Sequence, residues 1–167
     1  MENKRFIILF FLLIVSDHFV ASEILTNNED DLWHNVTEIS QLNGTWKGNV
    51  SETRSGPGIT VDAKIDMILT INSSANIISQ NVVMNNKFSG ALLFVIWNQV
   101  RRRIADVPDF DAMVDNSTNT VTLTRNEGPR ILDEDEIVRI KNHTMINKNG
   151  TKITWDFGEI NITLIKQ

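Results

Sequence analysis

The stretch Ile59–Asn72, "ITVDAKIDMILTIN", has the clearest pattern in the chain. Apolar residues occupy every second position from Ile59 to Ile71, and the positions between them are polar except for Ile68. Successive side chains of a β-strand point to opposite faces, so this alternation places the apolar side chains together. We therefore expect a long strand with one buried face.

Segments on both sides of this strand show the same two-residue period, with turn residues between them. The further expected strands are Thr45–Ser51, Asn76–Met84, Lys87–Gln99, Asn119–Arg125, Glu136–Ile146, Thr151–Phe157 and Glu159–Lys166. Asn149-Gly150 suits a hairpin turn, because both residues can adopt positive φ. Short connections of this kind predict an antiparallel meander.

The segment before these strands has a different period. Leu32, Val36 and Ile39 recur at helical spacing behind acidic residues, which predicts a short N-terminal helix. About eight strands, each with a single apolar face, can bury that face by closing into a barrel or by stacking as two sheets. The absence of cysteine argues against an immunoglobulin-type sandwich. The fold class that we expect is all-β.

Trp46 lies in the stretch "LNGTWKGN" (Leu42–Asn49), where two Asn-x-Ser/Thr glycosylation triplets overlap. In a strand, Trp46 shares its face with Gly48 and Val50, whereas Asn43 and Asn49 point the other way. The ring can therefore lie inside while both sugars lie outside. The same alternation puts the asparagines of two other triplets, Asn72 and Asn161, on the outer face.

The chain contains eight such triplets, which are acceptor sites for N-linked sugars in secreted proteins. Their asparagines are Asn35, Asn43, Asn49, Asn72, Asn116, Asn142, Asn149 and Asn161. An asparagine-rich composition also produces such triplets freely. We expect the outward-facing sites to be modified, with Asn149 less accessible because of its tight turn.

The N-terminus predicts secretion. Lys4 and Arg5 precede the apolar run Phe6–Val15, and Val20-Ala21-Ser22 offers a cleavage point for a signal peptidase. The run is shorter than the roughly 20 residues that a membrane anchor needs. We therefore divide the chain into a signal peptide (1–22), an N-terminal segment with the short helix (23–41) and a barrel domain (42–167). The resulting protein is expected to be extracellular and without a membrane span.

The helical lead-in, the Gly44-Thr45-Trp46 motif at the first strand and the following meander resemble the lipocalins and the wider calycin group. The resemblance implies a roughly eight-stranded barrel. It also implies that Trp46, next to Gly44, packs across the closed end of this barrel. In lipocalins a basic side chain from late in the chain often covers that tryptophan, and Lys166 is the candidate here. Avidins, which are also calycins, likewise begin with Gly-x-Trp and end on their last strand.

Composition and spacing favour a protein that is not an enzyme. The net charge of −5 disfavours nucleic acid as a partner, and the chain has no cysteine nucleophile. Only His34 and His143 follow the signal peptide, without the spacing of a metal site. Acidic clusters at Asp106, Asp109 and Asp111 and at 133–136 are interpreted as solvated loops. We expect no metal and no cofactor.

The expected function is that of a secreted carrier for a small hydrophobic ligand. The residues expected to line its interior are apolar, which favours a fatty or aromatic guest. They are Val50, Ile65, Met67, Leu69, Val121, Ile153, Trp155 and Phe157. The alternative is an extracellular interaction module with a solid barrel, which binds a protein through its outer surface.

The stretch Phe88–Trp97, "FSGALLFVIW", does not alternate. As a strand it would expose Leu93, Val95 and Trp97 on its outer face. Either the N-terminal helix covers these side chains, or they form a contact surface for a second copy of the chain or for another extracellular protein.

Overall fold

The computed structural model describes residues 32–167 except 105–106, 108 and 158–159. The predicted signal peptide lies outside the described residues. Backbone but no side chain is described for residues 103, 104, 156, 157 and 160. The elements, in chain order, are β1 (Trp33–Asn35), η2 (Ile39–Leu42), β2 (Gly44–Gly56), β3 (Ile59–Asn72), β4 (Ile77–Ser89), α2 (Leu93–Ile104), β5 (Asp111–Asp115), β6 (Thr120–Ile131), α3 (Glu134–His143), β7 (Met145–Asn147), β8 (Lys152–Phe157) and β9 (Ile160–Lys166).

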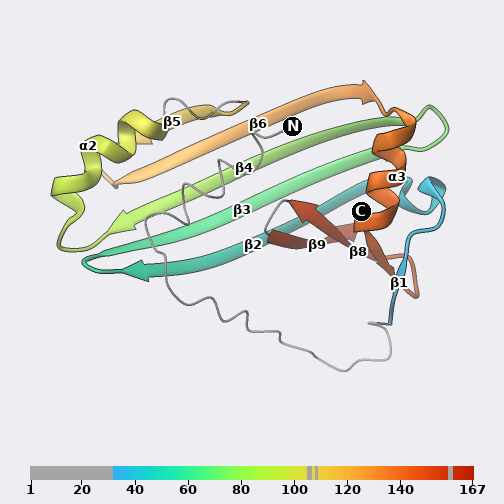
Figure 1. Ribbon diagram of the computed structural model, residues 1–167, viewed down its shortest axis with the longest axis horizontal. Coiled ribbons are helices and arrows are strands. Elements are labelled where there is room, and N and C mark those ends of the chain that lie inside the picture. Colours follow the sequence, from blue (N-terminus) through green and yellow to red (C-terminus); the bar gives the residue numbers. More distant parts are fainter. Residues whose placement is uncertain (1–31, 105–106, 108, 158–159) are drawn as a thin grey trace. The chain divides into compact units, whose positions relative to one another are not determined.

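The strands form one sheet in the order β1-β7-β8-β9-β2-β3-β4-β6-β5 (Figure 1). The pairs β1/β7, β7/β8, β8/β9, β9/β2 and β6/β5 are antiparallel, so the all-β class is confirmed. The expected barrel is not: within the described residues the order has two ends, β1 and β5, and the sheet does not close.

The contacts divide the described chain into two compact units. Unit 1 consists of residues 50–66 and 82–125, and unit 2 of residues 32–49, 67–81 and 126–167. The long strands β2, β3, β4 and β6 supply residues to both. Each unit is considered by itself below.

Trp46 is at the centre of unit 2. Its side chain is fully buried, and its indole Nε1 donates a hydrogen bond of 2.7 Å to the carbonyl of Leu42. The Nζ atom of Lys166 lies 5.2 Å from the centre of the indole ring, a distance suited to a cation–π contact. The expected contact between Trp46 and Lys166 is therefore confirmed.

Glycines allow β2 and β9 to approach each other closely beside Trp46. Trp46 pairs with Lys166 in the β2/β9 register. At Gly48 an added Cβ would lie 2.2 Å from the carbonyl oxygen of Thr163 and 2.8 Å from Cδ2 of Leu164. Gly44 has a φ of +122°, and Cε of Lys166 lies 3.2 Å from the position of its missing Cβ. Only glycine suits both positions.

The predicted N-terminal helix is wrong. Residues Trp33–Asn35 instead form β1, which pairs with β7, and the four residues of η2 form a 3-10 turn. Val36 is buried, and its amide donates to the carbonyl of Thr144. The helical spacing was misleading because pairing with a distant strand decides the conformation here.

The predicted strand Glu136–Ile146 is also wrong, because most of it is α3. The side chain of Asp133 accepts a hydrogen bond from the amide of Glu136, and that of Glu136 accepts one from the amide of Asp133. This reciprocal cap fixes the helix start. The acidic cluster 133–136 thus begins a helix and is not a loop.

The predicted strand Lys87–Gln99 is divided between two elements. β4 ends at Ser89, and α2 begins at Leu93 after Gly90, whose φ is +121°. Leu93, Trp97 and Val100 then recur at helical spacing, and Val100 is buried. A short run that is apolar at every position fits a strand and a helix equally well, so periodicity could not decide.

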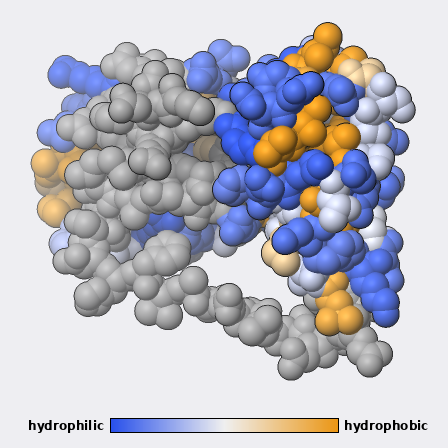
Figure 2. Space-filling model, turned by 45° about the vertical axis from the view of Figure 1, so that its right-hand side comes forward, coloured by the Kyte–Doolittle hydropathy of each residue, from blue (hydrophilic) through white to orange (hydrophobic). Residues whose placement is uncertain are grey.

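In the coloured part of the face shown in Figure 2, hydrophilic residues surround hydrophobic patches. The large hydrophobic residues exposed on unit 2 are Leu32, Ile68, Ile131, Val138, Met145 and Ile165. Those exposed on unit 1 are Leu92, Phe94, Val95 and Met113. Neither helix in the described part of the chain has the length and apolar content required to cross a bilayer.

The close contact between β2 and β9 predicts that Gly48→Ala destabilises the fold. The new methyl group would overlap the backbone of β9, and separating the strands should lower the free energy of unfolding by about 1–3 kcal/mol. Gly128→Ala is the control, because a Cβ there meets no atom within 4 Å. Urea unfolding measures both. Equal midpoints for the two variants would contradict the close approach.

Candidate ligand-binding face

Three neighbouring strands of unit 1 present buried apolar side chains. β3, β4 and β6 follow one another in the sheet, and alternate residues on each are buried. We call this set the apolar face: Ile59, Val61 and Ile65 on β3, Val82, Met84 and Phe88 on β4, and Val121 and Leu123 on β6. Binding sites for apolar ligands consist mostly of side chains of this kind.

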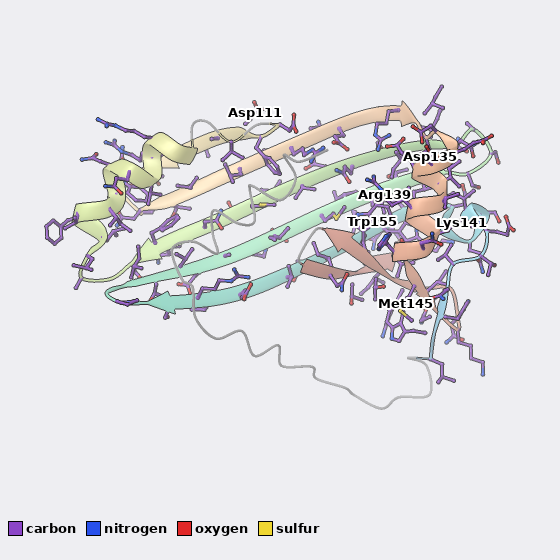
Figure 3. The ribbon with its side chains drawn as sticks, viewed as in Figure 1. Asp111, Asp135, Arg139, Lys141, Met145 and Trp155 are labelled. Atoms are coloured by element: carbon purple, nitrogen blue, oxygen red, sulfur yellow. The ribbon has the colours of Figure 1, made fainter. Side chains whose placement is uncertain are left out.

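The structure divides the expected ligand-binding residues between the two units. In unit 1, Ile65 and Val121 belong to the apolar face, and Val50 on β2 is half-buried. In unit 2 the expected residues Met67, Leu69, Ile153 and Trp155 are buried. Trp155 lies on β8 (Figure 3), two residues after Ile153 on the same strand. The side chain of Phe157 lies outside the described residues.

Asn86 is the one polar member of the apolar face. It lies on β4 in phase with Met84 and Phe88 and is 3% exposed. Its Nδ2 donates to the carbonyl of Val121 at 3.5 Å, at the outer limit of hydrogen-bond distance. Burying an amide with so weak a partner costs free energy. Asn86 is therefore unusual for a residue that only stabilises the fold.

A second buried asparagine forms shorter hydrogen bonds than Asn86 does. Asn147, in unit 2, is 1% exposed, and its Oδ1 accepts from the amides of Thr151 and Lys152 at 2.8 Å each. These bonds hold the β7–β8 turn, where Gly150 has a φ of +67°. Asn147 thus has a structural role. Asn86, by contrast, has one long hydrogen bond, to the carbonyl of Val121.

Asn86 was not among the predicted site residues, because two separate strands were expected, one ending at Met84 and the next beginning at Lys87. Asn85 and Asn86 fell between them. In the structure β4 continues through both residues, and Asn85 Oδ1 accepts from the Thr122 hydroxyl at 3.0 Å on the other face. A signal was present in the sequence: Asn86 is in phase with the apolar residues on both sides.

The acidic clusters lie on different elements. Asp111 is at the start of β5 and Asp135 is in the first turn of α3 (Figure 3). Asp109 and Asp111 are exposed, and Asp106 lies outside the described residues. A hydrogen bond of 2.8 Å from Arg130 lowers the pKa of Glu136, against an opposing effect of burial.

Neither histidine belongs to a cluster of metal-binding residues. His34 and His143 are exposed, and among the described residues no group of three or more His, Cys, Asp or Glu side chains can hold a metal ion.

All eight asparagines of the glycosylation triplets are exposed. They lie on strands, in turns and on α3. The four predicted from strand alternation to face outward, Asn43, Asn49, Asn72 and Asn161, are among them. Asn149, for which the tight turn suggested poorer access, is exposed as well.

The predicted contact surface of Leu93, Val95 and Trp97 is only partly exposed. These residues lie on α2, so they do not share one face as they would in a strand. Val95 is 55% exposed, whereas Leu93 and Trp97 are half-buried. The exposed apolar residues at this end of α2 are Leu92, Phe94 and Val95, which we call the α2 patch.

A shallow depression of about 200 Å³ lies elsewhere on unit 1. Its lining residues are Ser51, Glu52, Thr53, Asp62, Ala63 and Lys64. The hydroxyl of Thr53 donates to Asp62 at 2.7 Å across it. Because Asp62 and Lys64 alternate with residues of the apolar face, this polar depression does not belong to the candidate site.

No protein-family model, no curated protein and no solved structure matches this chain.

The contrast between the two buried asparagines leads to a stability prediction. Asn86→Leu should raise the free energy of unfolding by about 1 kcal/mol, because it removes a poorly bonded amide from an apolar face. Asn147→Leu is the matched control and should lower it by about 1–3 kcal/mol, since two backbone amides lose their acceptor. Urea unfolding measures both. A loss at Asn86 as large as that at Asn147 would mean that Asn86 is structural.

Proposed function

We propose that this protein is a secreted, non-enzymatic glycoprotein that carries a small hydrophobic ligand, as calycins such as the lipocalins do. The observation that carries the proposal is the apolar face of unit 1 with the poorly bonded Asn86 amide within it. Ligand sites are mostly apolar and contain a few polar groups that orient the guest.

Two further observations support the proposal. The first is the cation–π contact between Lys166 and Trp46, which is the arrangement expected from the calycin resemblance. The second is the exposure of all eight triplet asparagines, which supports a glycoprotein that passes through the secretory pathway. The proposal that it is not an enzyme rests on the sequence, which has no cysteine and only two histidines after the expected signal peptide.

Ligand binding is tested with two molecules that differ in one hydroxyl group, 1-decanol and decane. Each displaces a fluorescent fatty-acid probe from the purified protein. We expect dissociation constants on the order of micromolar and tighter binding of 1-decanol, because its hydroxyl can bond to Asn86. Asn86→Leu should weaken 1-decanol binding about tenfold and leave decane binding unchanged.

Native mass spectrometry of protein secreted by its own cells complements this test by detecting bound lipid and sugars together. Protein that is free of small molecules and binds no probe at micromolar concentration would refute the carrier function.

The α2 patch supports a second candidate function, an extracellular interaction module. Phe94 is 80% exposed, Val95 55% and Leu92 46%, and all three lie within four consecutive positions of the sequence. Contiguous apolar residues at a surface often mark a contact site. The module would then act through this patch and would need no ligand.

This candidate predicts self-association through the α2 patch. The double variant Phe94→Ser/Val95→Ser should fold normally, because neither side chain is buried, and should convert a dimer to a monomer. Met113→Ser on β5 is the control, since Met113 is 67% exposed but lies outside the patch. Light scattering gives the molar mass. A monomeric wild-type protein would exclude a second copy as the partner.

A further inference from the structure

The glycosylation triplets are distributed unevenly. Seven of the eight asparagines belong to unit 2: Asn35, Asn43, Asn49, Asn72, Asn142, Asn149 and Asn161. Asn116 alone belongs to unit 1, in the turn between β5 and β6. The surroundings of Asn116 therefore determine which contacts a sugar on unit 1 would make.

The side chain of Asn116 connects this turn to α2. Its Oδ1 accepts a hydrogen bond of 3.0 Å from Nε1 of Trp97 and one of 3.4 Å from Nη1 of Arg101. Trp97 in turn packs edge-on against Phe88, with ring centres 5.6 Å apart, and Phe88 is buried. One amide oxygen thus links the turn, the helix and the end of β4.

The turn that presents Asn116 is itself fixed. The carboxylate of Asp115 accepts from the amide and hydroxyl of Ser117, at 2.8 and 2.6 Å, and from the hydroxyl of Thr118 at 2.8 Å. These bonds lower the pKa of Asp115 to about 2, so the group remains ionised at neutral pH. Asn116 therefore lies in a turn that has its own side-chain hydrogen bonds in addition to the bonds to α2.

N-glycosylation is compatible with both hydrogen bonds to α2. The side-chain Nδ2 forms a bond to the anomeric carbon of an oligosaccharide, whose pyrophosphate carrier leaves, and one Nδ2 proton is lost to solvent. The carbonyl Oδ1 stays an acceptor. A bulky group on Nδ2 also hinders rotation that would turn Oδ1 away from Trp97 and Arg101.

We propose that Asn116 carries a structural N-glycan that holds α2 against the β5–β6 turn. The first sugar lies beside the indole and guanidinium groups and limits the access of water to their hydrogen bonds. The asparagines of the other seven triplets belong to unit 2. The inference rests on the proposed function only in requiring a secreted glycoprotein.

Hydrogen exchange of the α2 backbone, residues 93–104, tests the proposal. Wild-type protein from a glycosylating host is compared with the same protein trimmed to one N-acetylglucosamine and with Thr118→Ala, which lacks the acceptor triplet. We expect α2 to exchange equally slowly in the first two and about fivefold faster in the third.

Two controls isolate the sugar from the mutation. Thr118→Ala and wild type are both made in a host that does not glycosylate, and their difference measures the lost bond between Thr118 and Asp115. Ser74→Ala removes the triplet at Asn72 in unit 2 and should leave α2 exchange unchanged.

Mapping the occupied glycosylation sites distinguishes failure of the proposed function from failure of the inference alone. If no asparagine carries a sugar, the proposed secreted glycoprotein is refuted together with the inference. If the sites of unit 2 are occupied but Asn116 is not, or if its sugar does not alter α2 exchange beyond the mutation control, the inference alone is overturned.

Discussion

The burial of Trp46 between the start of β2 and the end of β9 is the constraint on which unit 2 depends. Its indole nitrogen bonds to the carbonyl of Leu42, and the ammonium group of Lys166 covers the ring. This ties the N-terminal part of the described chain to its last strand, which the amide of Gln167 extends by donating to Thr45. Contacts between residues so far apart in sequence are slow to form, because the chain must first close a long loop.

Asparagine occurs in three different environments in this chain, and we propose a different role for each. Asn147 is buried with short hydrogen bonds and holds a turn. Asn86 is buried with one long bond, and its proposed role is to orient a guest. Asn116 is exposed, its oxygen bonds to α2, and its nitrogen is the proposed attachment point of a sugar. The residue type alone distinguishes none of these roles.

Predictions from the sequence were correct where the two faces of a strand differ clearly in burial. The alternation in Ile59–Asn72 gave β3 with the correct bounds, and the face assignment around Trp46 correctly separated the buried ring from the exposed Asn43 and Asn49. It failed for α2, whose first five residues are all apolar and show no period, and for β1, which is too short for its own period to show. The candidate site was found in part: Ile65 and Val121 were predicted, whereas Asn86 fell between two expected strands.

The sequence by itself determined the all-β class, the buried and exposed faces of the long strands, and the outward position of Asn43, Asn49, Asn72 and Asn161, because alternation is a local property of extended backbone. The tertiary structure decided which strands are neighbours, that the sheet stays open over the described residues, and where helices replace expected strands. Those outcomes depend on pairing between distant segments, such as β2 with β9 and β1 with β7. The tertiary structure also decided the hydrogen bonding of Asn86, because its partner Val121 lies on another strand.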